Sequence, residues 1–307
     1  MKNEESRIKN EESRTKNSLP RFATRQQDLK HTTKMIEINN VTFSYPRTSH
    51  KVFTDFSCRL SEGNICGLLG KNGTGKSTML YLICGLLFPR QGSITVDGYE
   101  SHRRRPEMLS ELFIVPEEYD LPDVSLSTFL ETNLPFYPRF SREMFYQCLS
   151  DFELSDALNL GSLSMGQKKK VYMSFALATG TKYLFMDEPT NGLDIPSKSQ
   201  FRQALTGSIT SGRTVVVSTH QAHDVEALLD HVMILSESGL LLNSSVADIC
   251  ERYAFDYRSP GGMDSSVLYA EPTLQGNAVI VRRSDGEPKT PLNLELLFNA
   301  TVKQCLS

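Results

Sequence analysis

The chain has 307 residues, a net charge of −3 at pH 7 and 39% hydrophobic residues. This length is enough for one large domain or two smaller ones, and the small net charge argues against a nucleic-acid-coating protein and predicts no nucleic-acid partner. The apolar run at 79–88 is far shorter than the roughly 20 residues of a membrane-spanning helix. Because the N-terminus also lacks an apolar segment, we expect no secretory signal peptide and a cytosolic protein.

The first 34 residues carry a tandem heptad, KNEESRI followed by KNEESRT and a decayed third copy. In the two clear copies only the last position is ever apolar, as at Ile8, so the repeat has no hydrophobic seam for a coiled coil. We predict that 1–34 is disordered. Organised sequence begins at Met35, which is also a candidate for the true start of translation.

Six scattered cysteines show no CxxC spacing, and four of them lie in apolar runs. This usage predicts reduced cysteines that serve mainly in packing.

From residue 35 onward, strand-like and helix-like segments follow one another in an α/β order. A glycine-rich loop separates the early strands from the first helix. After residue 163 helices and strands alternate, and we expect one helix after the strand 182–188 and another after the strand 213–220. This rhythm is typical of a parallel sheet with crossover helices, so we predict an α/β fold. The expected strands are 35–46, two runs within 52–70, 92–98, 112–116, 182–188, 213–220 and 231–235, and the expected helical segments include 76–87 and 126–160.

The chain beyond residue 245 has a different character. A helix-like stretch from residue 246 leads to short strand-like runs at 265–271 and 277–283 and a final helix at 292–302. We predict a small C-terminal α+β domain over 246–307.

The stretch GKNGTGKS, Gly70–Ser77, matches the phosphate-binding pattern GxxxxGK[ST] between an apolar strand and a helix. The backbone amides of 72–76 are expected to cradle the β-phosphate of a nucleotide. Lys76 would neutralise charge on the β- and γ-phosphates, and the hydroxyl of Ser77 would bind Mg²⁺.

The stretch KYLFMDEP, Lys182–Pro189, ends an apolar strand in two carboxylates. A lone Asp-Glu pair is more often a solvated turn, but a strand tip behind a phosphate loop favours a catalytic role. We predict that Asp187 holds the metal and that Glu188 is the general base that polarises water.

The stretch LSMGQKKK, Leu163–Lys170, places a serine and a glycine just before a helical pattern. Free N–H groups and the positive end of the helix dipole suit an anion at such a position. The same residues also fit an ordinary helix N-cap, and this segment alone leaves both interpretations open.

Taken together, these motifs stand in a distinctive order. The phosphate loop is followed by LSMGQ at 163–167, LFMDEPTNGLD at 184–194 and STH at 218–220. The order and spacing resemble the ATP-binding subunits of ABC transporters over about 35–248. The resemblance implies a P-loop NTPase, RecA-like core over 35–245, with an inserted α-helical subdomain at about 120–161.

The resemblance also implies roles for particular residues. Ser164 and Gly166 would face ATP held on the phosphate loop of the other protomer, so each site would be complete only in a dimer. Tyr45 matches the aromatic residue that stacks on adenine, His220 the switch histidine and Asp194 an aspartate that communicates across the dimer. The expected nucleotide-binding residues are Tyr45, Gly70, Lys71, Asn72, Gly73, Thr74, Gly75, Lys76, Ser77, Thr78, Ser164, Gly166, Gln167 and Asp194, the expected metal residues are Ser77, Asp187 and Glu117, and the expected catalytic residues are Lys76, Glu188 and His220.

Two positions depart from the commonest family pattern. Met165 replaces a glycine of the signature, and Glu117 stands where a glutamine is usual. Such variants resemble those of drug- and lipid-export ATPases of the ABC-2 type, and 292–303 resembles the tail of that group. The resemblance therefore implies a Mg²⁺-dependent ATP hydrolase that works as a homodimer, or as a heterodimer with a related ATPase. It would drive a separately encoded permease and lie peripherally on the inner face of the cell membrane.

Rival interpretations remain beside the exporter. The main one is an ABC ATPase that is not coupled to transport. The aromatic-rich stretch 134–149 fits either the core of the helical subdomain or a docking surface for the permease. The basic run 102–105 fits a solvated face or, less directly, attraction to anionic lipid.

Overall fold

The computed structural model describes residues 35–306, apart from 211, 238, 275 and 285. The predicted disorder of 1–34 lies outside these residues. Within the described part of the chain, no helix is long and apolar enough to cross a membrane.

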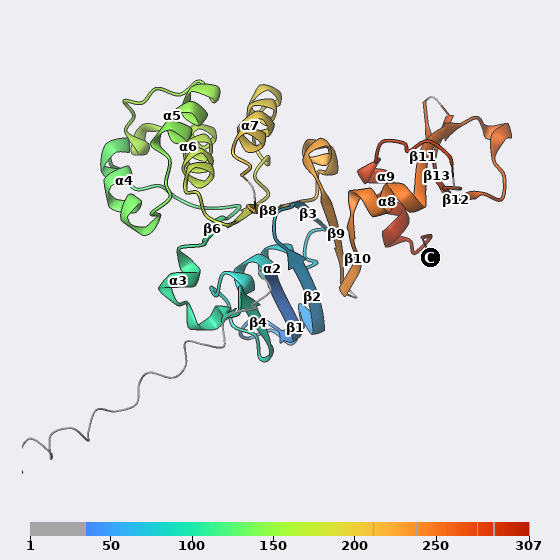
Figure 1. The fold of residues 1–307 in the computed structure, drawn as a ribbon, viewed down its shortest axis with the longest axis horizontal. Helices are drawn as coiled ribbons and strands as arrows, with labels where there is room; N and C mark the ends of the chain where they lie inside the picture. The colour runs from blue at the N-terminus through green and yellow to red at the C-terminus, as the bar shows by residue number, and fades with distance from the viewer. Residues whose placement is uncertain (1–34, 211, 238, 275, 285, 307) are drawn as a thin grey trace, which may run out of the picture. The chain divides into compact units, whose positions relative to one another are not determined.

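A central sheet runs in the order β10-β9-β3-β8-β7-β6 (Figure 1). The strands from β9 to β6 pair in parallel, as predicted, whereas β10 adds an unpredicted antiparallel edge. All residues of β3, β7 and β8 are buried, as expected for strands covered on both faces. The strands are β3 (Ile65–Leu69), β6 (Leu112–Val115), β7 (Tyr183–Asp187), β8 (Thr214–Thr219), β9 (His231–Ser236) and β10 (Gly239–Ser245).

A second, antiparallel sheet runs in the order β2-β1-β4-β5. Buried and more exposed residues largely alternate along β1, so one face of this sheet supplies most of its core contacts. That face shares a hydrophobic cluster with helix α2 and with β3 and β7 of the central sheet. The elements are β1 (Met35–Phe43), β2 (Phe53–Ser61), β4 (Gln91–Val96), β5 (Tyr99–Glu100) and α2 (Lys76–Ile83).

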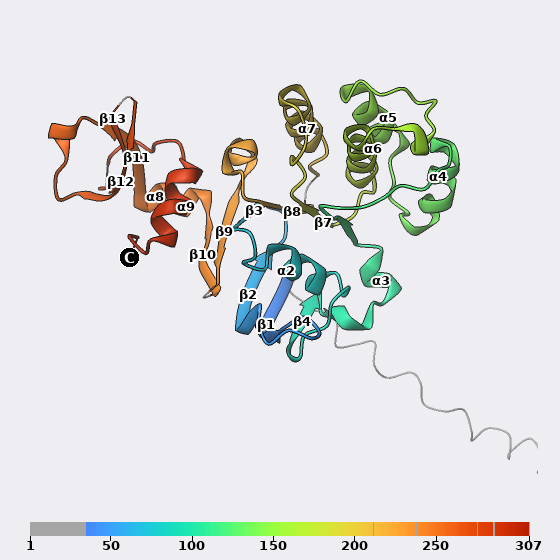
Figure 2. The same ribbon diagram turned by 180° about the vertical axis from the view of Figure 1, so that it is seen from behind.

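Helices α4, α5 and α6 lie together, apart from β1, β2 and β4, in both Figure 1 and Figure 2. Ser125 caps α4 and Ser141 caps α5, each by accepting an N–H from the first turn. Pro135 and Pro138 separate these two helices, which explains why the helical pattern of 126–160 is interrupted. The helices are α3 (Pro106–Leu109), α4 (Leu126–Asn133), α5 (Arg142–Asp151), α6 (Met165–Ala178) and α7 (Ile195–Gly207), with short 3₁₀ turns at Ser101–Arg103, Leu134–Phe136 and Leu160–Ser162.

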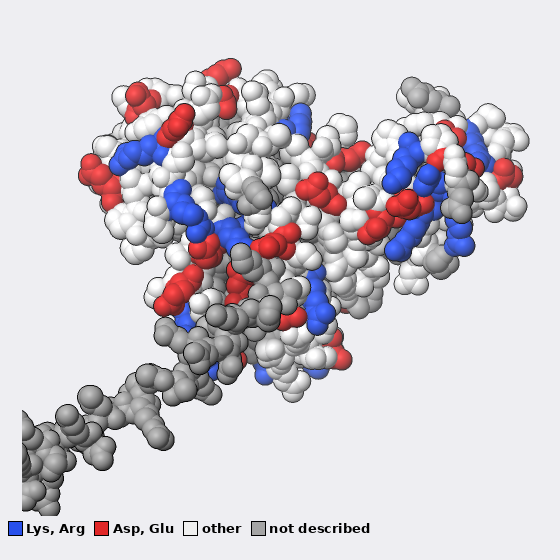
Figure 3. Space-filling model, in the orientation of Figure 1, with Lys and Arg blue, Asp and Glu red and all other residues white. Residues whose placement is uncertain are grey.

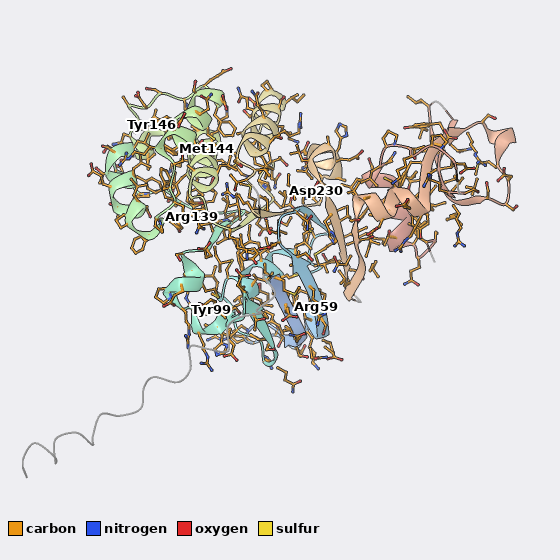
Figure 4. The ribbon with its side chains drawn as sticks, viewed as in Figure 1. Arg59, Tyr99, Arg139, Met144, Tyr146 and Asp230 are labelled. Carbon is orange, nitrogen blue, oxygen red and sulfur yellow. The ribbon has the colours of Figure 1, made fainter. Side chains whose placement is uncertain are left out.

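Arg139 joins this helical segment to the central sheet (Figure 4). Its Nε donates to the carbonyl of Gly180 at 2.8 Å, and one terminal nitrogen donates to the Glu111 carboxylate at 2.7 Å. Two-point contacts of a guanidinium fix orientation as well as distance. The helical segment is therefore held in a defined position next to β6 and β7.

The C-terminal part contains a small antiparallel sheet in the order β11-β13-β12 and two helices. Phe255 and Ile280 of this sheet and Leu297 of α9 belong to the same hydrophobic cluster as Val232 of β9. The segment therefore packs directly against the rest of the described chain. Its elements are α8 (Val246–Arg252), β11 (Tyr253–Arg258), a 3₁₀ turn at Pro260–Gly262, β12 (Val267–Thr273), β13 (Gly276–Arg282) and α9 (Leu294–Val302); β11 was not predicted.

Two predicted helices differ from the structure. Helix α2 ends at Ile83 rather than at residue 87, because Gly85 takes a φ of +66° and the N–H groups of Gly85 and Leu86 close a Schellman motif on Leu82 and Tyr81. The prediction of a helix between β8 and β9 is wrong, because two 3₁₀ turns, Ala222–Asp224 and Glu226–Leu228, lie there. Tertiary contacts hold them, since Asp224 pairs with Lys198 at 2.7 Å and Glu226 accepts the N–H of Leu294 at 3.1 Å.

The six cysteines all fall within the described residues and are unpaired there. Five are buried, and burial raises the pKa of each of these thiols. They therefore serve in packing, as predicted.

Candidate functional site

The phosphate-binding loop leads from the carboxyl end of β3 into α2, and two glycines make its path possible. Gly73 and Gly75 have φ values of +87° and +97°, a region that other residues seldom adopt. A Cβ on Gly75 would also come within 2.8 Å of Phe53 and Val52. The loop therefore brings backbone N–H groups and the N-terminus of α2 to one place.

Lys76 is buried at the first position of α2. Its Nζ donates to the carbonyl of Gly70 at 2.8 Å and to that of Lys71 at 3.3 Å. The same nitrogen lies 3.7 Å from Oε1 of Glu188. The ammonium is thus held between the loop backbone and a carboxylate.

Two carboxylates stand where β7 ends, beside the end of β8. Asp187 pairs in register with Ser218, and its Oδ1 accepts a hydrogen bond from the Ser218 hydroxyl. Glu188 follows with a φ of +46°, which is uncommon outside glycine and typical of residues held at functional sites. Its N–H donates to the carbonyl of Ser218 at 3.0 Å, and its Oε1 lies 2.9 Å from Nδ1 of His220.

A cavity of about 570 Å³ unites most of the predicted site. Tyr45 lies at its wall, where its hydroxyl is 3.0 Å from Oγ1 of Thr78. His50, Val52 and Asn191 also line the cavity, although the sequence analysis did not identify them. The predicted residues that line it are Tyr45, Asn72, Gly73, Gly75, Lys76, Ser77, Thr78, Glu117, Glu188 and His220.

Glu117 reaches this cavity from the segment after β6. Its Oε1 accepts a hydrogen bond from Nδ2 of Asn191 at 3.0 Å. Asn191 closes a turn with Glu188, since its own N–H donates to the Glu188 carbonyl at 3.1 Å. The departure from glutamine is therefore accommodated by an amide that donates to the carboxylate.

Ser164, Gly166 and Gln167 do not line this cavity. Ser164 caps α6: its hydroxyl accepts the N–H of Gln167 at 3.3 Å, and Oε1 of Gln167 accepts the N–H of Ser164 at 3.0 Å. The N-cap interpretation of this stretch is confirmed, and its predicted role toward a second protomer stays a prediction. Met165 beside them is 70% exposed.

Asp194 also lies outside the lining of the cavity. It caps α7 by accepting the N–H of Ser197 at 2.9 Å, and hydrogen bonds from Ser197 lower the pKa of the Asp194 carboxyl. The aspartate thus has a defined local task in this chain, while its role across a dimer remains a prediction.

Lys169 is a residue that the sequence analysis missed. It is buried, and its Nζ donates to the carbonyl of Glu188 at 3.0 Å and to that of Asn191 at 2.7 Å. Burial lowers the pKa of Lys169, against the opposing effect of Glu117 and other nearby carboxylates. The run of three lysines gave no signal that its middle member is buried.

A second cavity, of about 790 Å³, lies between α3, β6 and the aromatic-rich stretch 134–149. Phe136 and Tyr137 line it together with Leu86 and Leu109, and Phe136 is 67% exposed. Phe145 from the same stretch is fully buried. The stretch therefore contributes both to the core and to an apolar cavity wall.

Charged side chains do not form one extended basic face in the view of Figure 3, where acidic and basic groups are interspersed. In the basic run 102–105, Arg103 pairs with Glu100 at 2.6 Å and Arg104 donates to the carbonyl of Gly85 at 3.0 Å. These side chains are exposed, which agrees with a solvated face.

Comparison with known proteins decides the family. Residues 53–191 match the family described as ABC transporter. The chain is 30% identical over 211 residues to the ABC transporter ATP-binding protein NatA of Bacillus subtilis. The aligned region covers 66% of this chain and 85% of NatA. The chain belongs to the ABC transporter ATP-binding proteins.

Solved structures agree with this assignment. One, described as the ATP binding subunit of an ABC transporter, has a TM-score of 0.62 at 25% identity and covers 70% of this chain and 91% of its own. Another is the dimeric structure of the ATP-binding cassette MJ0796 in a post-hydrolysis state, bound to ADP and Pi. It has a TM-score of 0.60 at 24% identity, and the match covers 69% of this chain and 99% of that one. The predicted P-loop NTPase fold is confirmed, and the assignment to the ABC ATP-binding family supports ATP binding and hydrolysis.

Proposed function

We propose that the cavity beside the phosphate loop is the site where this ABC ATP-binding protein hydrolyses ATP to ADP and phosphate. The observation that carries the proposal is the position of the buried Glu188 carboxylate, between Nζ of Lys76 at 3.7 Å and Nδ1 of His220 at 2.9 Å. Glu188 accepts a proton from the attacking water, as a general base next to the phosphates. Lys76 neutralises phosphate charge, and His220 orients the carboxylate.

The remaining contacts with ATP come from the loop and the cavity wall. Backbone N–H groups of 72–76 bind the phosphates, as at other loops that lead into a helix N-terminus. Tyr45 stacks on adenine, a contact of about 1–3 kcal/mol if it is like other base–aromatic stacks. Its hydroxyl contact with Thr78 links this ring to the first turn of α2.

The side chains near the loop fit Mg²⁺, because they offer hard oxygen ligands. Ser77 and Glu117 line the cavity, and the buried Asp187 stands at the adjoining strand end. The described residues contain no cluster of three or more acidic, histidine or cysteine ligands, so the set suits an ion that is shared with phosphate oxygens. When bound, Mg²⁺ would neutralise charge on the β- and γ-phosphates.

The site is completed by a second protomer, either an identical chain or a related ATPase. Ser164 and Gly166 lie at the start of α6, outside the lining of the chain's own cavity. Apart from its chain neighbours and the nearby backbone of the helix, a Cβ built on Gly166 would meet no atom of the described residues within 4 Å. The dipole of the 14-residue helix α6 favours an anion at this end. We propose that this anion is the γ-phosphate on the partner's loop and that Asp194 communicates between the two sites.

We further propose that ATP turnover drives a separately encoded permease, in the direction of export. The apolar cavity walled by Leu86, Leu109 and Phe136 supports docking of a membrane subunit. Such docking would hold the chain at the inner face of the membrane. The export direction rests on the ABC-2-like departures at Glu117 and Met165.

Copurification from detergent-solubilised membranes tests the transport proposal against an ATPase that is not coupled to transport. We expect the chain to retain a multi-span membrane protein, and Phe136→Asp to release that protein while ATPase activity is kept. Tyr257→Asp is the matched control, because Tyr257 is an exposed aromatic on the C-terminal sheet. Equal retention in both variants, or no membrane partner for the wild type, would contradict docking at this cavity.

A further inference from the structure

The Lys169 side chain is buried in the interior of the protein, on the helix that begins with the signature residues. Its two hydrogen-bond acceptors are backbone carbonyls, those of Glu188 at 3.0 Å and Asn191 at 2.7 Å. A buried ammonium is costly unless it is hydrogen-bonded, and a buried carbonyl is costly when it loses its donor. Lys169 therefore depends on these two carbonyls for its hydrogen bonds, and it shares the Glu188 carbonyl with the N–H of Asn191, which donates to the same oxygen at 3.1 Å.

The two carbonyls belong to the two ends of one tight turn. Asn191 N–H donates to the Glu188 carbonyl at 3.1 Å, which closes residues 188–191. Each end of the turn carries a side chain that faces the ATP cavity: the Glu188 carboxylate at the start, and the Asn191 amide, which binds Glu117, at the end. Lys169 thus holds both ends of the segment on which the proposed base stands.

Glu188 needs such support because its backbone has a φ of +46°. A residue other than glycine keeps this conformation only when its surroundings hold it there. The Lys169 ammonium and the Ser218 carbonyl, which accepts the Glu188 N–H at 3.0 Å, hold the peptide groups on either side of Glu188.

We propose that Lys169 is a positioning residue that keeps the Glu188 carboxylate in its reactive place between Lys76 and His220, an inference that rests on the proposed role of Glu188 as base. Lys169 acts through the turn and contacts neither ATP nor water in the reaction. Its removal therefore affects the chemical step, while the loop that binds the phosphates is unchanged.

The neighbouring lysine provides a matched control. Lys168 precedes Lys169 on α6, but its ammonium pairs at 3.1 Å with Asp120, whose side chain is 87% exposed. The Lys168 side chain is itself only 17% exposed, but its ammonium pairs with a carboxylate in solvent, where water and salt screen the interaction. Lys168→Met thus removes the same chemical group from the same helix without touching the turn.

The test compares Lys169→Met, Lys169→Arg and Lys168→Met by steady-state ATPase assays and by ATP affinity from calorimetry. We expect Lys169→Met to lower kcat about 10- to 100-fold, the cost of a small displacement of a catalytic group, with the Kd for ATP changed less than about threefold. Lys169→Arg keeps a long cation that can reach the carbonyls and should recover part of kcat. Lys168→Met should match the wild type.

A double-mutant cycle separates positioning from a general loss of structure. If Lys169 acts through Glu188, then Lys169→Met should have little further effect on kcat when Glu188→Gln is already present. An equal fold-loss in both backgrounds, or a wild-type kcat in Lys169→Met, would overturn the inference. If Lys169→Met does not fold, Lys169→Arg takes its place in the cycle.

The two proposals fail in different ways. A normal kcat in Glu188→Gln alone would overturn the assignment of the base, and the positioning inference with it. A strong loss in Glu188→Gln together with an unaffected Lys169→Met would overturn only the inference.

Discussion

Glu188→Gln isolates the chemical contribution of the proposed base. The substitution keeps the size of the side chain and an oxygen that can still accept from the His220 ring, 2.9 Å away. It removes the negative charge and nearly all basicity. We therefore expect kcat to fall by about 10²–10⁴, the usual share of a positioned base, which corresponds to about 2.7–5.5 kcal/mol in the barrier.

In contrast to kcat, the affinity of Glu188→Gln for ATP should rise or stay constant. Glu188 is buried, and its Oε1 lies 3.7 Å from Nζ of Lys76. Two opposite charges at that separation attract by about 4.5 kcal/mol at an effective dielectric constant near 20, before the cost of desolvation is subtracted. Without this carboxylate, the Lys76 ammonium no longer pairs with Glu188 and can bind the phosphates of ATP instead. The substitution also removes the electrostatic repulsion between Glu188 and ATP.

Phosphate-release assays give kcat, and calorimetry with ATP gives Kd. The variant should also accumulate as an ATP-bound dimer in size-exclusion chromatography. Glu131→Gln, which changes an exposed carboxylate on α4, is the control for a loss of charge as such. Turnover of Glu188→Gln within about threefold of the wild type would refute the assignment, because a positioned base contributes at least about 10².

Three further predictions concern single side chains. Glu117→Gln removes one negative charge from the cavity, so we expect a modestly weaker Mg²⁺ dependence with turnover retained; an unchanged Mg²⁺ titration would place Glu117 outside the metal's surroundings. Phe145→Ala empties a fully buried position and should lower the free energy of unfolding in urea by about 3–5 kcal/mol, whereas a loss below about 1 kcal/mol would contradict its place in the core. The pKa of Asp194 is lowered by hydrogen bonds from Ser197, so its contribution to stability is present above the ordinary value of 3.8 and is lost as the pH falls through the lower folded value. The melting temperature of Asp194→Ala should therefore lie below that of the wild type at pH 7 and approach it as the pH falls below 3.8; a difference that is the same at both pH values would contradict this account of the cap.

Features that depend on local sequence could be predicted well. The glycine spacing and lysine of Gly70–Ser77 determine the phosphate loop, and the fully apolar strands β3 and β7 could be recognised from their composition. Even the cap at Ser164 follows from residues three positions apart.

Contacts between distant segments could not be predicted. Lys169 reaches carbonyls 19 and 22 positions away, and Glu117 binds an amide 74 positions away. Neither contact leaves a pattern in the neighbouring residues. The helix wrongly expected after β8 has the same cause, because Asp224 and Glu226 are engaged by α7 and by the start of α9.

The central claim is that ATP is hydrolysed in sites shared between two protomers. Lys76→Ala damages a chain's own phosphate loop, and Ser164→Arg damages the signature that it presents to its partner. Each variant alone forms homodimers without an intact site. In a heterodimer of the two variants, both lesions fall in one site, and the other site combines an intact loop with an intact signature.

The decisive measurement is the ATPase activity of an equimolar mixture of the two variants, with heterodimer formation verified by differential tags. A chain that carries both changes, added in excess to wild type, is the control, since its heterodimers have one lesion in each site and should be poorly active. We predict that the mixture of single variants regains activity that neither has alone. If heterodimers form and the mixture stays as inactive as its components, LSMGQ does not serve the partner's ATP and the shared-site account is wrong.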